Sequence, residues 1–227
     1  MEQLVQEKNI RKISYRDFAT AILKREYGGT TVAGTIHIAH RVGIRVFATG
    51  GIGGVHANST FDMSTDLVSL ANTPLIVVCA GAKAILDLPA TLEVLETIGV
   101  PVVGYQTDEF PAFYSRESGL PVSVRLDSVD EIVEFARTHW DLGFGSAILV
   151  ANPPPLASAI PRNEIDHSIE KAQLEAEQQN IHGQELTPFL LSRITELSKG
   201  ASLRTNIDLL LNNARLAAQI ACRVANR

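Results

Sequence analysis

The chain has 227 residues, with 20 Lys plus Arg and 25 Asp plus Glu, which gives a formal net charge of −5 at pH 7. Hydrophobic residues make up 45% and charged residues 20%, so a core can form and wholesale disorder is excluded. The acidic balance argues against a sequence-independent nucleic-acid binder. No apolar run approaches the roughly 20 residues that cross a bilayer, and the polar start is not typical of a secretory signal. The two cysteines lie too far apart in sequence to suggest a disulfide framework, so we expect a cytoplasmic α/β enzyme.

Short apolar runs rich in β-branched residues alternate with helical patterns along the first two thirds of the chain. The runs are nearly continuous, as in strands that are buried on both faces of a parallel sheet. The predicted strands span residues 44–49, 74–79, 100–105 and 146–150. Helices with the apolar spacing of sheet-covering helices are predicted over residues 31–42, 64–72, 83–98 and 127–140.

The last third of the chain is predicted to be helical. Prolines at 153–155 separate it from the alternating part, and its helices are expected over residues 164–180, 186–197 and 202–224. Alternation of strand and helix is the signature of α/β layering. We therefore predict one α/β domain over residues 1–227, a mostly parallel sheet covered by helices (α/β/α layers) in about 1–155 and a helical part in about 156–227.

Two glycine-rich segments could bind an anion. Residues 49–56 follow the first predicted strand but match neither a Walker loop nor a dinucleotide fingerprint. Glycine lets backbone amides approach a phosphate, and a flexible connection is an equally good interpretation on composition alone. Thr49 and His56 favour a polar ligand because each offers a donor. The pair at 28–29 precedes an apparent helix start, which predicts either an anion site or an N-cap at Thr30.

Lys83 lies where a buried strand is expected to end and a helix to begin, after the small residues Ala80, Gly81 and Ala82. Ligands of open α/β sheets bind at such edges. Among apolar neighbours the amine would be desolvated, which lowers its pKa and makes it a nucleophile toward carbonyl carbon. A helix-surface lysine is the alternative, and most lysines are of that kind. Cys79, inside an apolar run, is expected to be a buried, inert thiol.

Residues 61–66 place two carboxylates and two hydroxyls at a predicted helix start. Oxygen ligands of this kind suit Mg²⁺ or Mn²⁺, although capping by Ser64 or Thr65 is the commoner role of such residues. Capping would leave Asp62 available for another role. Lys12 lies beside a short apolar–polar alternation and is expected on a solvated face.

Asparagines interrupt the last predicted helix. Asn206 lies near its start, and Asn212 and Asn213 break its apolar run. A buried amide needs hydrogen-bond partners, so Asn206 is expected either to hold a ring or hydroxyls of a ligand or to cap the helix.

Taken together, these segments resemble one family, the pseudouridine-5′-phosphate glycosidases. The similarity runs from about residue 11 to the C-terminus and includes several long and specific motifs. The motifs that carry it are GGTTVAGT (28–35), FATGGIGGVH (47–56), FDMSTDL (61–67), CAGAKAILDL (79–88), GVPVVGYQTDEFPAF (99–113), LVANPPP (149–155), LTPFLLSRITEL (186–197) and LLLNNARLA (209–217).

The resemblance implies reversible cleavage of the C–C glycosidic bond of pseudouridine 5′-phosphate to uracil and ribose 5-phosphate. Such a bond cannot be broken by protonating a leaving oxygen, so the two-carboxylate scheme of ordinary glycosidases does not apply. The family opens the ribose ring and holds C1′ as an imine of a lysine, which acts as an electron sink. The resemblance also implies a divalent metal, typically Mn²⁺, and a homotrimer with a small-molecule substrate and no nucleic-acid or membrane partner.

Matching motifs place the family's functional residues on this sequence. The lysine of the AGAK motif implies Lys83 as the imine-forming nucleophile, and the FD-x-S motif implies Asp62 as the metal ligand. Lys12, in a K-[IV]-S-x-R-D stretch, would pair with phosphate, and Asn206 would reach the site from the last helix. The other substrate-binding positions that the resemblance implies are Thr31, Val32, Thr49, His56, Ser64, Thr65 and Asp66, the last as a proton-transfer or ring-orienting group.

Two departures from the family pattern are visible. The segment after GGVH, commonly longer and charged, is here the short stretch 57–60, so phosphate binding is expected to be weaker or supplied differently. Family chains also carry a further N-terminal segment with a glutamate that acts as general acid/base. No residue here matches it, because Glu2, Glu7 and Glu26 lie in unrelated contexts. We therefore expect the chain to begin at a position internal to the family sequence and to lack that proton donor.

Two alternative functions stay open. A homologue without the glutamate could form the imine and bind a sugar phosphate yet turn over slowly, since a general acid/base contributes about 10²–10⁴-fold. A lysine-imine, aldolase-like enzyme acting on another sugar phosphate would use the same lysine and loops, and only the motif match argues against it.

Overall fold

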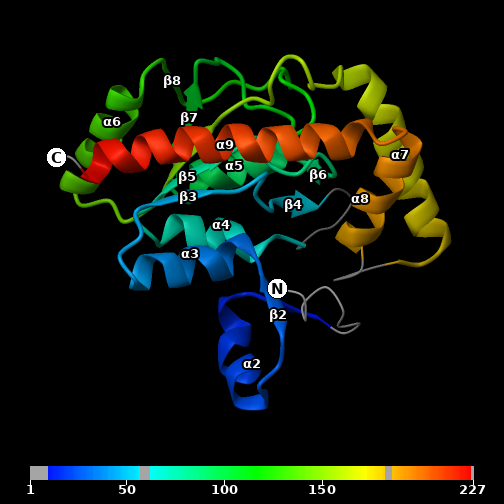
Figure 1. The fold of residues 1–227 in the computed structure, drawn as a ribbon, viewed down its shortest axis with the longest axis horizontal. Helices are drawn as coiled ribbons and strands as arrows, with labels where there is room; N and C mark the ends of the chain where they lie inside the picture. The colour runs from blue at the N-terminus through cyan, green and yellow to red at the C-terminus, as the bar shows by residue number, and fades with distance from the viewer. Residues whose placement is uncertain (1–9, 57–61, 182–185, 226–227) are drawn as a thin grey trace.

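The computed structural model describes residues 10–56, 62–181 and 186–225. Figure 1 shows its helices and strands as one layered body. In chain order they are β1 (Arg11–Ile13), the 3-10 helix η1 (Tyr15–Asp17), α2 (Phe18–Lys24), β2 (Gly28–Thr30), α3 (Val32–Arg41), β3 (Val46–Ala48), β4 (Val55–His56), α4 (Thr65–Ala71), β5 (Ile76–Cys79), β6 (Leu86–Asp87), α5 (Leu88–Thr97), β7 (Val102–Tyr105), β8 (Val124–Leu126), α6 (Val129–Asp141), β9 (Ile148–Ala151), α7 (Arg162–Gln178), α8 (Leu186–Leu197) and α9 (Ala201–Ala225).

A five-stranded parallel sheet forms the centre, in the order β3-β5-β9-β7-β8. In its register, Val46 pairs with Ile76, which pairs with Ile148. The predicted parallel strands are confirmed as β3, β5, β7 and β9, and every residue of β5 and β9 is buried. Strand β8 was not predicted because it is only 3 residues long and has Arg125 at its centre. Two short pairs lie outside this sheet, β1 with β2 and β4 with β6.

Helices cover both faces of the sheet, so the predicted α/β/α layering is confirmed (Figure 1). On one face the core includes Ile36 of α3, Leu67 of α4 and Leu95 of α5. On the other face it includes Ile132 of α6 and Ile220 of α9. Burial of each such Leu or Ile side chain stabilises the fold by roughly 1.5–3 kcal/mol. The two helical layers therefore fix the position of the sheet and of the loops at its edge.

The C-terminal helices complete this cover. Helix α9 packs against β3, β5 and α6 and runs across the sheet in Figure 1. Helices α7 and α8 pack against each other, and Arg193 of α8 forms an ion pair with Glu175 of α7. In the described ranges, no helix is both long and apolar enough to span a membrane.

The helix predicted over residues 83–98 begins later than expected. Helix α5 starts at Leu88, and Asp87 caps it by accepting a hydrogen bond from the Ala90 amide at 3.0 Å. A capping carboxylate satisfies a free amide of the first turn and favours a helix start at that point. Lys83 therefore lies in the loop between β5 and β6 and not on a helix.

The glycine pair at 28–29 does not lead directly into a helix. It begins strand β2, which pairs in parallel with β1. The N-cap of α3 is Thr31 and not Thr30, since the Thr31 hydroxyl accepts a hydrogen bond from the Gly34 amide at 3.1 Å. The Thr30 hydroxyl instead lies 2.8 Å from that of Thr35.

The surroundings of Gly81, two residues before Lys83, predict that adding one methyl group there strongly lowers the free energy of unfolding. Its φ is +88°, and a Cβ there would lie 2.0 Å from the Pro111 carbonyl oxygen, whereas Gly143 has a similar φ of +90° with nothing within 4 Å of a Cβ. We expect Gly143→Ala to lower the free energy of unfolding by about 1–2 kcal/mol through backbone strain. Gly81→Ala should cost up to about 3 kcal/mol more because of the clash. Urea unfolding compares the two variants, and equal losses would contradict the clash.

Candidate active site

Two loops at the carboxyl edge of the sheet are joined by backbone hydrogen bonds. The Ala80 amide, after β5, donates to the Gly50 carbonyl, after β3, at 2.8 Å. The Ile52 amide donates to the Gly81 carbonyl, and the Lys83 amide donates back to the Ile52 carbonyl, both at 3.1 Å. Because ligands of open parallel sheets bind at this edge, the paired loops fix Lys83 where a ligand is expected.

The Lys83 side chain is half-buried, and burial lowers the pKa of its amine. The negative charge of Asp66 raises this pKa, and the positive charge of Lys12 lowers it. Burial is the largest of these effects, as expected for an amine taken out of water. The desolvation predicted from the sequence is confirmed. Lys12 is exposed, as expected, yet it lies close enough to act on Lys83 through its charge.

Asp66 is the buried anion beside this lysine, with 3% of its surface exposed. One carboxylate oxygen accepts a hydrogen bond from the Ala33 amide at the start of α3, and the other from the Gly53 amide in the glycine-rich loop, both at 2.8 Å. Hydrogen bonds to an ionised group are shorter and stronger than neutral ones. The carboxylate therefore ties α3, α4 and the glycine-rich loop into one unit.

The turn before α4 contacts this loop and the segment after β1. A Cβ at Gly53 would lie 2.2 Å from the Ser64 hydroxyl oxygen, so this close approach requires glycine. Ser64 is the N-cap of α4, as one of the two predicted caps, and its hydroxyl accepts from the Asp66 amide at 3.2 Å. The Thr65 hydroxyl lies 2.8 Å from that of Ser14. The predicted substrate-binding turn is thus held from both sides.

Thr31 and Val32 start α3 next to the same carboxylate. The Thr31 amide donates to the Ile13 carbonyl at 2.8 Å, which fixes the helix start against β1. Val32 is half-buried and packs against the core. The following residue, Ala33, donates to Asp66. These two predicted positions therefore lie within the unit that Asp66 organises.

A chain of buried amides joins α9 to the carboxyl edge. Asn213, which is fully buried, donates from Nδ2 to the Thr49 carbonyl at 2.8 Å and accepts at Oδ1 from Asn152 Nδ2 at 3.0 Å. The backbone of Thr49 is thereby held from a residue 164 positions away. Asn152 and Asn213 were not among the predicted site residues. The asparagines that interrupt the apolar run of α9 are the sequence signal for Asn213.

Asn206 lies inside α9, which begins at Ala201, so the capping interpretation is wrong. A Cβ at Gly50 would lie 3.4 Å from its Oδ1, which places the amide against the glycine-rich loop. The other interpretation, that Asn206 holds a ligand, stays a prediction.

His56 and Asp62 lie on either side of residues 57–61, which are outside the described residues, so the short stretch after His56 stays a sequence-based expectation. The His56 amide donates to the Asp62 carbonyl at 3.0 Å. Asp62 is exposed, and its carboxylate oxygens are ligands of the kind that a hydrated Mn²⁺ or Mg²⁺ binds. Within the described ranges, no three His, Cys, Asp or Glu side chains are grouped to enclose a metal ion. An ion at Asp62 would therefore keep water and phosphate oxygens among its ligands.

Of the glutamates set aside in the sequence, the structure describes only Glu26. Glu26 forms an ion pair with Arg11 of β1 at 2.5 Å. Glu2 and Glu7 lie outside the described residues. The role of the family's acid/base glutamate is therefore not assigned to any residue in the described ranges.

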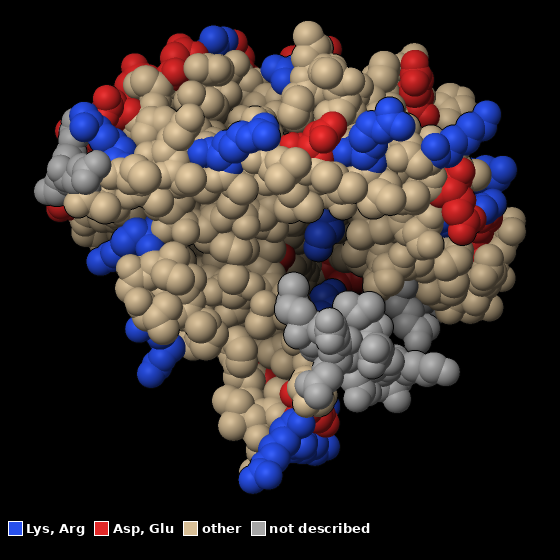
Figure 2. Space-filling model, viewed as in Figure 1, with Lys and Arg blue, Asp and Glu red and all other residues tan. Residues whose placement is uncertain are grey.

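Figure 2 shows a hollow below α9 in which basic and acidic side chains lie together. A separate cavity of about 600 Å³ is lined by parts of α5 and α6 and by Val102, the first residue of β7. The amino ends of parallel strands mark the opposite edge of the sheet from the paired loops, and none of the predicted site residues lines this cavity.

The charges around Lys83 predict opposite effects of two substitutions. Lys12→Met removes a positive charge and should raise the pKa of Lys83, whereas Asp66→Asn removes a negative charge and should lower this pKa further. Acylation of amines at a series of pH values, followed by peptide mass spectrometry, measures the neutral fraction of Lys83. Half-maximal labelling should move to higher pH in Lys12→Met and to lower pH in Asp66→Asn.

Circular dichroism serves as the control, because Asp66→Asn also weakens an amide contact. If that variant does not fold, the shift in the pH of half-maximal labelling in Lys12→Met alone tests the assignment. A shift of Lys12→Met to lower pH, or none, contradicts the electrostatic assignment.

Comparison with known sequences gives a consistent result over nearly the whole chain. The family described as "Indigoidine synthase A like protein" matches residues 1–223. The pseudouridine-5′-phosphate glycosidase of Methylobacterium nodulans is 57% identical over 216 residues, which are 94% of this chain and 64% of that protein. The enzyme of the same name from Caldanaerobacter subterraneus subsp. tengcongensis is 52% identical over 226 residues, 99% of this chain and 74% of that protein.

Solved structures share the fold. An indigoidine synthase A-like protein from Thermotoga maritima superposes with a TM-score of 0.90 at 36% identity, over 98% of this chain and 74% of that one. The prealnumycin C-glycosynthase AlnA, solved in complex with ribulose 5-phosphate, gives 0.90 at 39% identity, over 100% of this chain and 76% of that one. The chain thus spans about two thirds to three quarters of the proteins it matches. It belongs to the indigoidine synthase A-like family, and the resemblance of its motifs to the pseudouridine-5′-phosphate glycosidases is confirmed.

Proposed function

We propose that this protein is an enzyme that reversibly cleaves the C–C glycosidic bond of pseudouridine 5′-phosphate, which gives uracil and ribose 5-phosphate. The observation that carries the proposal is the desolvated amine of Lys83, held at the carboxyl edge of the sheet by two paired loops. The names of the curated relatives support the substrate. The ribulose 5-phosphate bound by AlnA supports a sugar phosphate as the kind of ligand.

The chemistry is easiest to follow in the direction of synthesis. Neutral Lys83 adds through Nζ to the aldehyde carbon C1 of open-chain ribose 5-phosphate, and loss of water gives a protonated imine. Carbon C5 of uracil attacks C1, so the electron pair of the new C–C bond comes from uracil while the C=N pair returns to nitrogen. The C5 proton passes to water, which restores the uracil ring. The oxygen of the 4-hydroxyl then bonds to C1 and closes the ribose ring, while Nζ takes up the hydroxyl proton and leaves as the free amine. Cleavage is the reverse sequence.

Burial of Lys83 serves the first of these steps. A lowered pKa increases the neutral fraction of the amine near pH 7, and only the neutral form attacks a carbonyl. Asp66 opposes this effect through its charge but fixes the loop that carries the lysine. Both carboxylate oxygens of Asp66 already accept backbone amides, which supports an orienting role better than proton transfer.

The proposal also assigns the other predicted residues to the substrate. Lys12, Thr49 and His56 would bind the phosphate, and Asn206 would reach the ribose or uracil from α9. The remaining contacts are assigned to Thr31, Val32, Ser64 and Thr65.

The metal part of the proposal rests on Asp62. Its exposed carboxylate would hold a divalent cation, Mn²⁺ by the family resemblance, together with water and phosphate oxygens. When bound, the cation would neutralise charge on the phosphate. A homotrimeric assembly in the cytoplasm belongs to the same proposal and is supported by the resemblance alone.

Reductive trapping tests the nucleophile. Borohydride added to the protein with ribose 5-phosphate should convert the imine to a stable secondary amine on Lys83, identified by peptide mass. Lys83→Arg should abolish the adduct because its guanidinium stays protonated, and the exposed control Lys171→Arg should retain it. An adduct on another lysine, or none in the folded wild type, would overturn the assignment.

A second function is that of a homologue that binds the sugar phosphate and forms the imine without turnover, since no described residue is assigned the acid/base role. Release of uracil from pseudouridine 5′-phosphate in the presence of Mn²⁺ separates the two functions. If borohydride traps the imine on Lys83 but no uracil is released, the protein has the second function.

The metal assignment predicts the effect of one carboxylate. Asp62→Ala should weaken Mn²⁺ binding at least about tenfold in isothermal titration calorimetry, because a hard cation with few protein ligands depends on each carboxylate. The matched control is Asp141→Ala, an exposed acid at the end of α6, which should bind as the wild type does. Equal affinity of the two variants would contradict Asp62 as the ligand.

A further inference from the structure

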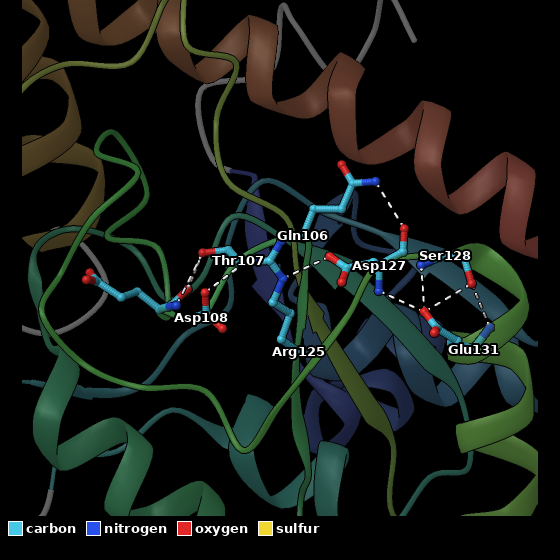
Figure 3. Close-up of polar contacts among 8 residues, drawn as sticks. Gln106, Thr107, Asp108, Arg125, Asp127, Ser128 and Glu131 are labelled. Atoms are coloured by element: carbon cyan, nitrogen blue, oxygen red, sulfur yellow. Dashed lines mark hydrogen bonds and ion pairs between the residues drawn. The ribbon is translucent and has the colours of Figure 1, made fainter.

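The connection between β7 and β8 contains a hairpin over residues 108–122, and charged side chains fix its base. Arg125 of β8 lies between two carboxylates, with its guanidinium 2.8 Å from both Asp108 and Asp127. Figure 3 shows this group, in which the Gln106 side chain also donates to the Asp127 carbonyl. Hydrogen bonds between charged groups are shorter and stronger than neutral ones. The hairpin is therefore held at the strand from which it starts and the strand to which it returns.

Backbone hydrogen bonds continue along the hairpin to a tight turn at its tip. The Phe110 amide donates to the Leu120 carbonyl at 2.8 Å, and Phe110 is fully buried. At the tip, the Ala112 amide donates to the Ser115 carbonyl at 3.0 Å, and the Ser115 amide donates back at 3.4 Å. The four residues of this turn thus have a defined place on the core.

Phe113, in this turn, has a backbone conformation that is unusual for its side chain. Its φ is +61°, which bulky residues rarely adopt and which hairpin turns usually give to glycine, asparagine or aspartate. The residue is also buried, with 4% of its surface exposed. A strained residue persists only where its surroundings fix it, and such residues are concentrated at functional sites. Its neighbours therefore hold Phe113 in a conformation that its own side chain disfavours.

The ring of Phe113 packs on the glycine-rich loop. A Cβ at Gly51 would lie 2.7 Å from Cδ2 of the ring and 2.8 Å from Cε2, so the contact leaves no room for a side chain at Gly51. The Phe113 amide donates to the Ala80 carbonyl in the lysine loop at 3.0 Å. One residue thus contacts both of the loops that are paired at the carboxyl edge.

The residues on either side of Phe113 hold the ring in this place. The Pro111 carbonyl oxygen lies so close to Gly81 that a Cβ there would be 2.0 Å away. The Tyr114 ring meets the Phe113 ring edge to face, with centroids 4.8 Å apart and planes at 79°. The Tyr114 carbonyl in turn accepts from the Ile160 amide at 2.9 Å. The ring is therefore supported on the side away from the glycine-rich loop.

We propose that Phe113 is a positioning residue for Lys83: its ring holds the glycine-rich loop at Gly51, and the pairing of the two loops passes this restraint to the lysine. The Ile52 amide donates to the Gly81 carbonyl, and the Lys83 amide donates to the Ile52 carbonyl, both at 3.1 Å. Because Ile52 follows Gly51, a shift of the ring would move both bonds. The proposal rests on the proposed function, in which Lys83 is the nucleophile, and adds a residue that the family resemblance did not assign.

The test compares Phe113→Leu with Phe135→Leu, a matched loss of one ring in α6 on the other face of the sheet. Acylation over a pH series, read by peptide mass spectrometry, reports the neutral fraction of Lys83 without any substrate. Half-maximal labelling should move to higher pH in Phe113→Leu, because a looser loop admits water and burial is the largest cause of the lowered pKa. Phe135→Leu should label as the wild type does. Both variants leave the charges of Asp66 and Lys12 in place.

Phe113→Gly separates the ring from the turn. Glycine adopts a positive φ without strain and keeps the amide that donates to Ala80, so the variant removes the ring alone. Half-maximal labelling of Lys83 should move to higher pH here too, and circular dichroism checks that each variant folds. If Phe113→Leu does not fold, Phe113→Gly decides. Wild-type labelling of Phe113→Gly, or equal labelling curves of Phe113→Leu and Phe135→Leu, overturns the proposal.

Borohydride trapping connects this residue to the reaction. With ribose 5-phosphate, the rate of adduct formation on Lys83 should fall at least about tenfold in Phe113→Leu and Phe113→Gly, because a small misplacement of a reacting group is costly. Phe135→Leu should keep the wild-type rate. If the folded wild type forms no adduct, the proposed function fails, and the labelling series still decides whether Phe113 positions Lys83. Wild-type trapping rates in both Phe113 variants would overturn the proposal.

Discussion

The buried carboxylate of Asp66 is the constraint on which the rest of the site depends. A charge that is 3% exposed is tolerated only where hydrogen bonds and an opposite charge compensate for lost water. The amides of Ala33 and Gly53 supply the hydrogen bonds, and Lys83 supplies the charge. To satisfy one carboxylate, the start of α3, the glycine-rich loop and the lysine loop must therefore converge, and the side chain at position 53 must be absent.

This arrangement balances two demands on Lys83. Burial lowers its pKa and favours the nucleophilic form, while the nearby anion raises the pKa and limits that effect. Lys12 shifts the balance back toward the neutral amine, and it does so from a strand that sequence patterning places on the solvent side. Reactivity at this position thus depends on burial and on the charges of Asp66 and Lys12, and no single residue type determines it.

The two edges of the central sheet are fixed in different ways. At β8, an arginine held between two aspartates occupies the edge. At β3, the residues are apolar and half-buried, and the carbonyl of Thr49 at the end of the strand is held by Asn213. Because Thr49 begins the glycine-rich loop, the hydrogen bond from Asn213 connects the end of this edge to a loop of the candidate site.

The sequence by itself determined the parallel α/β class, the main strands and helices, the family, and the desolvation of Lys83, because apolar periodicity and long local motifs express these properties over short stretches of chain. It could not place the start of α5, which depends on the cap formed by Asp87, or reveal β8, whose three residues acquire strand geometry by pairing with β7. The contact of Asn213 with Thr49, 164 positions apart, and the joining of Ala33 and Gly53 by Asp66 were decided only by the tertiary structure. These contacts depend on how the helices lie across the sheet. The local sequence does not specify which distant backbone group forms a hydrogen bond with a buried amide or carboxylate.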